Sequence, residues 1–143
     1  MDLNRLDWRR LNLKDGALPR DEAFLANYLE QLLEPDDLLL TTWRGDGHCD
    51  HEAAGRAAAQ AAQARRVQLA EAPVWAWHWA TPDDPRLPWP QAHRVQLDDT
   101  RLARKRQALA AHASQLQPDG EHPPVLPVTL QTCLLQPFEL IFL

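Results

Sequence analysis

One short apolar run constrains the fold of this 143-residue chain more than any other feature. Residues 38–43 read LLLTTW, and turn-forming Pro and Asp residues come directly before them. A continuous apolar run bounded by turn signals is typical of a strand buried on both faces of a parallel sheet. Helical periodicity comes before the run, at residues 21–33, and after it, at residues 51–65. We therefore expect an α/β fold in which helices flank a largely parallel sheet.

The rest of the chain adds further elements. Alternating apolar residues predict a strand at residues 6–13, and extended segments are expected at 67–69 and 73–79. A strand is expected at 93–97, a helix from Asp98 or Asp99 to about Gln115, a short helix at 128–135 and a last strand at 138–143. Loops rich in proline separate these elements at 81–90 and 117–127. Because the length suits one domain, we expect residues 1–143 to form a single α/β domain.

Three tryptophans alternate in the expected extended segment at residues 73–79. In a strand, Trp75, Trp77 and Trp79 would share one face and His78 would point to the other. Such a face can stack on a sugar, or it can form core or an interface, because aromatic side chains dominate cores.

Composition and charge argue against several classes of protein. A net charge of −5 argues against broad nucleic-acid binding, which needs a basic surface. No apolar run approaches the roughly 20 residues of a membrane helix, and the first ten residues lack the apolar centre of a secretory signal. Two cysteines cannot build a disulfide framework. We therefore expect a cytoplasmic protein with no membrane span and no nucleic-acid partner.

The loop that follows the apolar run carries the densest chemistry in the chain. From Trp43 to His51 it reads WRGDGHCDH, and it leads into a helix N-terminus, whose free N–H groups suit an anion or oxyanion. One of its two imidazoles can bind a metal while the other donates a proton or stabilises an oxyanion. Asp50 can orient a ring. Alternatively it only caps the helix and both histidines are solvated, because an H-x-x-H pair without further ligands is a weak zinc signal.

Residues 42–57, TWRGDGHCDHEAAGRA, resemble the second conserved motif of the PIG-L/LmbE-like deacetylases. These are zinc-dependent enzymes that remove acetyl groups from N-acetylglucosamine-type substrates. Residues 10–16, 73–79, 105–116 and 125–142 also resemble segments of the family in the same order, so the resemblance covers nearly all of the chain. It implies a Rossmann-like fold, Zn²⁺ as cofactor and an acetylated amino-sugar conjugate as the small-molecule substrate.

The resemblance also implies a role for individual residues of the loop. His51 matches the histidine that ligates zinc. His48 matches the catalytic histidine that stays off the metal and stabilises the tetrahedral intermediate, and Asp50 matches the carboxylate that tunes and orients that histidine. We expect the start of the loop to contact the substrate, through Trp43, Arg44 and Asp46.

Two departures from the family pattern matter. Cys49 replaces the family's proline between the motif His and Asp, which relaxes the loop; a Cys49 thiolate ligand is the less favoured interpretation, because adjacent side chains diverge. The family's H-P-D-D-E-type motif, which supplies the other zinc His and Asp and the general base, does not occur in this sequence. The sequence therefore resembles the C-terminal portion of a deacetylase without its first βα units, with one identifiable zinc ligand.

Two functions from different classes follow from these observations. The chain is either a truncated or partial N-deacetylase that hydrolyses an N-acetyl amide, or a non-catalytic pseudoenzyme or interaction subunit that pairs through an exposed sheet edge. A homodimer or a complementing N-terminal segment would cover that edge. The intact His48, Asp50 and His51 favour the enzyme, and the missing motif favours the interaction subunit.

Overall fold

A computed structural model describes residues 6–143 of the chain. The first five residues, which include half of the segment in which no secretory signal is expected, lie outside the described residues. Within residues 6–143, no helix has both the length and the apolar character needed to cross a membrane.

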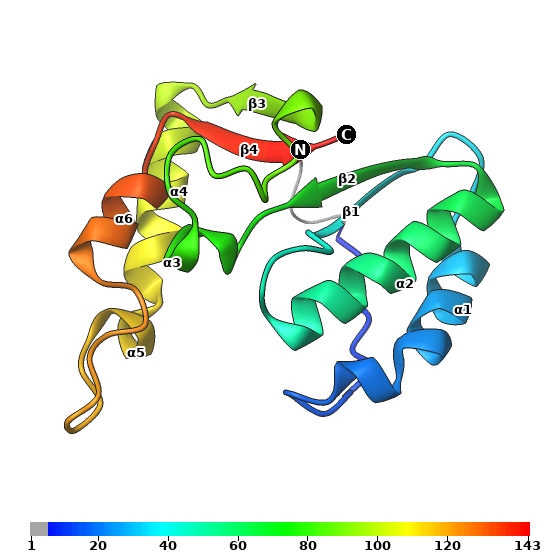
Figure 1. Ribbon diagram of the computed structural model, residues 1–143, viewed down its shortest axis with the longest axis horizontal. Helices are drawn as coiled ribbons and strands as arrows, with labels where there is room; N and C mark the ends of the chain where they lie inside the picture. Colours follow the sequence, from blue (N-terminus) through cyan, green and yellow to red (C-terminus); the bar gives the residue numbers. More distant parts are fainter. Residues whose placement is uncertain (1–5) are drawn as a thin grey trace.

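The centre of the fold is a β–α–β unit. Strand β1 (Leu38–Thr42) pairs in parallel with β2 (Gln68–Ala72), and helix α2 (Cys49–Arg65) connects them. Helix α1 (Glu22–Leu32) precedes β1 and packs along α2, and both helices lie beneath the β1–β2 end of the sheet (Figure 1). The helices predicted on either side of the LLLTTW run are confirmed, and the run itself forms the predicted strand, β1.

Small residues let α2 lie close to this pair of strands. Its buried positions are five alanines and one glycine: Ala53, Gly55, Ala57, Ala58, Ala61 and Ala62. A Cβ atom at Gly55 would lie 2.6 Å from the carbonyl oxygen of Thr42, closer than real Cβ contacts. The absence of a side chain at this position therefore sets the distance between helix and sheet.

The sheet as a whole is mixed, which corrects the expectation of a largely parallel one. Its order is β1-β2-β4-β3, where β4 (Phe138–Phe142) runs antiparallel to β2 and to β3 (Ala92–Gln96). Only the β1–β2 pair is parallel among the described strands. A short link connects helix α6 (Val128–Leu134) to β4, and β4 then runs in the direction opposite to β2. Apolar patterning reports burial and carries no information on strand direction.

Strand β1 is less buried than its sequence predicts. Leu38 and Leu40 expose 58% and 62% of their surface. Leu38 and Leu40 point to the same face of β1, and this face is less covered than the face to which Leu39 points. Among the described strands, β1 is the last at its end of the sheet, so its outer edge has no strand partner within residues 6–143.

Two segments expected to be extended have other structures. Residues 6–13 form no strand. Trp8 and Leu11 line one open pocket together with Leu25 and Leu29 of α1, and a helix offers no backbone ladder to pair with. Residues 76–79 form the short helix α3 (Ala76–Trp79). The three tryptophans therefore do not share a strand face, since successive helical residues point in directions about 100° apart.

The remaining helices gather beneath the β3–β4 end of the sheet (Figure 1). Helix α4 (Asp99–Ala111) is capped by Asp98, whose carboxylate accepts a hydrogen bond from the Arg101 amide at 2.7 Å, and α5 (Ala113–Leu116) follows it. Two short 3₁₀ turns, η2 (Leu18–Arg20) and η3 (Trp89–Gln91), complete the described elements. Trp43 and Phe142 form the main buried cluster, with Ala76 and Leu87 packed beside them.

Candidate functional site

The histidine loop leaves the carboxyl end of β1 and enters α2, as the sequence predicts. Gly47 turns this loop with a φ of +82°, and a Cβ atom there would lie 2.7 Å from the indole nitrogen of Trp79. That indole N–H donates to the carbonyl oxygen of Asp46 at 2.8 Å. The loop is thus held against α3, an element some thirty residues later in the chain.

Asp46 is the structural centre of the site and has no exposed surface. Its Oδ1 accepts hydrogen bonds from the amides of Val74 and Ala76, each at 2.8 Å, and its Oδ2 accepts from the amide of Trp75 at 2.7 Å. Oδ2 also lies 2.5 Å from Nδ1 of His51. Three backbone donors in a row turn the chain into α3, and the same carboxylate fixes a histidine.

This arrangement gives Asp46 a different place from the one expected for it. The substrate contact predicted for Asp46 requires an accessible carboxylate, and all of this one is enclosed by protein. The geometry instead makes Asp46 a positioning residue for His51.

The Asp46 contact also sets the proton position on His51. An ionised carboxylate only accepts hydrogen bonds, so Nδ1 of His51 must donate. In the neutral ring, Nε2 then carries a free lone pair, the form in which histidine binds a metal. The side chain of His51 is 25% exposed.

His48 holds its proton on the opposite nitrogen. It is the N-cap of α2, and its Nδ1 accepts a hydrogen bond from the backbone amide of Asp50 at 3.3 Å. A ring nitrogen that accepts carries no proton, so Nε2 of neutral His48 is an N–H donor. The ring centroids of His48 and His51 are 4.4 Å apart, which places a donor beside a lone pair.

The carboxylate of Asp50 binds backbone amides of the N-terminal segment and not either imidazole ring. It accepts hydrogen bonds from the amides of Gly16 at 2.6 Å and Leu18 at 3.0 Å. The bond from Gly16, helped by the one from Leu18, holds the pKa of this carboxyl below its usual value of 3.8, although desolvation opposes the shift. Asp50 therefore orients His48 through its backbone and fastens the N-terminal segment through its side chain.

Trp43 and Arg44 lie outside the pocket formed by the histidines. Trp43 is buried to 9% exposure, with its ring edge on Phe142 at 5.2 Å between centroids. The guanidinium of Arg44 pairs with both oxygens of the buried Glu71, at 2.9 and 2.7 Å. These contacts place the two residues in the support of the loop.

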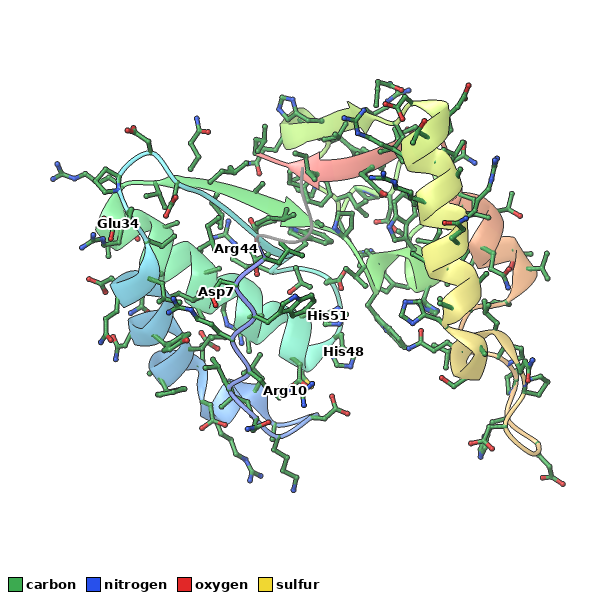
Figure 2. The ribbon with its side chains drawn as sticks, turned by 180° about the vertical axis from the view of Figure 1, so that it is seen from behind. Asp7, Arg10, Glu34, Arg44, His48 and His51 are labelled. Carbon is green, nitrogen blue, oxygen red and sulfur yellow. The ribbon has the colours of Figure 1, made fainter. Side chains whose placement is uncertain are left out.

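A pocket of about 360 Å³ lies in front of the two imidazoles. Figure 2 shows both rings at the start of α2, projecting toward the elements that cover the other end of the sheet. His78 of α3 and His112, at the end of α4, line the same pocket, and Trp75 stacks on His78 at 4.2 Å between centroids. Sequence spacing gave no signal for His112, because it reaches the pocket only through the tertiary fold.

A complete zinc centre is not present among the described residues. Catalytic zinc typically takes three protein ligands and a water, and residues 6–143 contain no cluster of three or more His, Cys, Asp or Glu side chains placed to hold a metal ion. His51 fits one ligand position, because a carboxylate behind the ring is the usual support of a ligating histidine. Cys49 is exposed at the first turn of α2 and does not line the pocket.

Comparisons with protein-family models, with curated protein sequences and with solved structures found no match to this chain.

Proposed function

We propose that this chain is the oxyanion-stabilising part of a PIG-L/LmbE-like zinc-dependent N-deacetylase. The observation that carries the proposal is the complementary pair of histidines. An N–H donor on His48 and a lone pair on His51 lie side by side at one pocket. A hydrogen bond at Nδ1 of each ring fixes which nitrogen carries the proton. Hydrolysis of an amide needs a donor for the carbonyl oxygen and a ligand for the metal, and one loop supplies both.

The residues of this chain act on the oxygen side of the amide. Nε2–H of His48 would donate to the carbonyl oxygen as negative charge develops there. The N-terminus of α2 adds partial positive charge at the same place. Donors preorganised in this way typically contribute about 10²–10³-fold to the rate of acyl transfer.

The remaining zinc ligands and the general base would come from a completing segment. The resemblance assigns them to an H-P-D-D-E-type motif that follows a strand. The open edge of β1 adjoins the histidine loop, so a strand added there would bring its own carboxyl end next to His51. Parallel addition at β1 would extend the sheet toward the Rossmann-like arrangement that the resemblance implies.

A non-catalytic interaction subunit is the second candidate function. The exposed leucines of β1 and the lack of a three-ligand cluster among residues 6–143 favour it. In this case the same edge binds a partner strand, while the histidines take no part in chemistry.

The test is to isolate the protein from the cells that make it, together with any bound partner. Zinc per chain and acetate release from N-acetylglucosamine conjugates are then measured on the same sample. A deacetylase contains about one zinc per chain and releases acetate until the metal is removed. A sample that retains a partner but lacks both zinc and acetate release identifies the interaction subunit instead.

A further inference from the structure

The pocket beside the histidines has an apolar wall on its far side. Five residues from α4, α6 and the loop between α5 and α6 form this wall: Leu109, Val125, Leu126, Leu130 and Leu134. The residues with polar side-chain groups that line the pocket are the four histidines, Gln115 and Trp75, whose ring carries a single N–H donor. No lysine, arginine, aspartate or glutamate is among the described residues that line it.

This lining discriminates between kinds of ligand. Burying sugar hydroxyls against leucine and valine side chains would leave their hydrogen bonds unmade, which is costly. A phosphate group would find no lysine or guanidinium to pair with. A hydrocarbon group meets neither penalty, and burial against the wall stabilises it in proportion to the area removed from water.

The apolar character of the wall decides which side of the amide it suits. The carbonyl carbon lies next to the oxygen that His48 would hold and bears both the acyl chain and the amide nitrogen, and of these two only the acyl chain is apolar. With the carbonyl at His48 and His51, the acyl chain can enter the pocket while the amino sugar faces solvent. The volume of about 360 Å³ falls in the range of ligand pockets and is far larger than the methyl group of an acetyl requires.

We propose that this pocket binds an apolar acyl chain longer than acetyl, so that the substrate class is an N-acyl amine with a hydrocarbon acyl group. The inference rests on the proposed function for the position of the amide. The acyl specificity itself rests on the wall.

The experiment is calorimetric titration of the purified full chain with N-acetyl-, N-butanoyl- and N-hexanoyl-glucosamine. Each methylene that enters the pocket should tighten binding by about fourfold. Val125→Asp places a charge in the wall and should abolish this gain. Val128→Asp is the matched control, because Val128 is 76% exposed and does not line the pocket. Leu109→Asn, on α4, repeats the test from a second element.

Equal affinities along the series, or no binding of any member, would overturn the inference. So would a gain per methylene that survives in both Val125→Asp and Leu109→Asn, with circular dichroism showing that the variants are folded. Failure of the proposed function has a different signature. The gain per methylene would then be present while the natively isolated protein releases neither acetate nor any longer acid.

Discussion

His48 and His51 lie three positions apart at the start of α2, yet their environments give them opposite chemistry. The difference lies in what the Nδ1 atom of each ring contacts. Nδ1 of His48 meets a backbone donor, and Nδ1 of His51 meets a buried carboxylate. In the neutral rings, Nε2 of His48 is therefore an N–H donor, and Nε2 of His51 carries a free lone pair.

Asp46→Ala should destabilise the protein strongly. The substitution leaves three backbone amides, of which one is buried and two are half-buried, and Nδ1 of His51 without their acceptor. Since an unsatisfied buried polar group costs about 1–3 kcal/mol, the loss in the free energy of unfolding should exceed ~3 kcal/mol. Urea denaturation followed by circular dichroism measures it. Asp15→Ala, at an exposed turn, is the control and should change stability by less than ~0.5 kcal/mol. Equal losses in the two variants would contradict the role of Asp46.

Asp50 should make the docking of the N-terminal segment depend on pH. Its pKa is lowered in the folded protein, so its contribution to stability is fully present above the unfolded pKa, near 3.8. The contribution is lost as the pH falls through the lower, folded pKa. The protection of the Gly16 and Leu18 amides against exchange, measured by NMR and corrected for the intrinsic exchange rate at each pH, should therefore fall only below pH 3.8. Asp50→Asn should remove this pH dependence of the protection, and a wild-type protection that stays constant across this window would refute the assignment.

At this scale the sequence predicted local features better than distant ones. The spacing of His48 and His51 at a helix start is local, so the pair was found. The partner of His51 was missed, because Asp46 acquires its role from amides about thirty residues away. Trp43 and Arg44 were assigned to the substrate for a similar reason, since Phe142 and Glu71 lie far away in the sequence.

Among the secondary-structure elements, α2 depends on Gly55 for its close approach to β1. Gly55→Ala would ordinarily stabilise a helix interior by about 1 kcal/mol. Here the new Cβ would lie 2.6 Å from the carbonyl oxygen of Thr42, in the backbone of β1. We expect a destabilisation of about 1–3 kcal/mol, measured by urea denaturation. The sign decides the matter, because any stabilisation would mean that α2 does not approach the strand this closely.

Element prediction succeeded where periodicity and packing agree. The patterns at residues 21–33 and 51–65 place apolar or small residues on one helical face, and both helices form. The alternating tryptophans failed, because hydrogen bonds to Asp46 bend the chain into α3 and override the period of two. Residues 6–13 failed because their neighbour is a helix and not a strand.

For the molecule as a whole, the open edge of β1 should drive association. Exposed Leu38 and Leu40 on an unpaired edge strand favour pairing with another strand. Sedimentation velocity should show association of the purified chain that increases with concentration. Leu38→Lys with Leu40→Lys should suppress it, and Val128→Lys, at an exposed site on α6, should not. A wild-type chain that is monomeric at all concentrations would count against the edge as an interface.

The direction of β4 shows what sequence patterns leave open about the whole molecule. The sequence predicts the strand itself at residues 138–143, and the strand pairs antiparallel with both of its neighbours, β2 and β3. Strand order and direction follow from how the connections cross the sheet, which a run of apolar letters does not encode. The four-histidine pocket belongs to this scale too, because α2, α3 and the end of α4 meet only in the folded chain.

The central claim is that His48 and His51 divide the work of one hydrolytic site. Its most direct test compares His48→Ala with His51→Ala in the natively isolated protein, with zinc content and kcat for amide hydrolysis measured on each. We predict that His48→Ala retains the wild-type zinc content while kcat falls by about 10²–10³-fold. His51→Ala should lose the metal together with the activity. If His48→Ala hydrolyses the amide at the wild-type rate, or if His51→Ala retains its zinc, the claimed division between the two histidines is wrong.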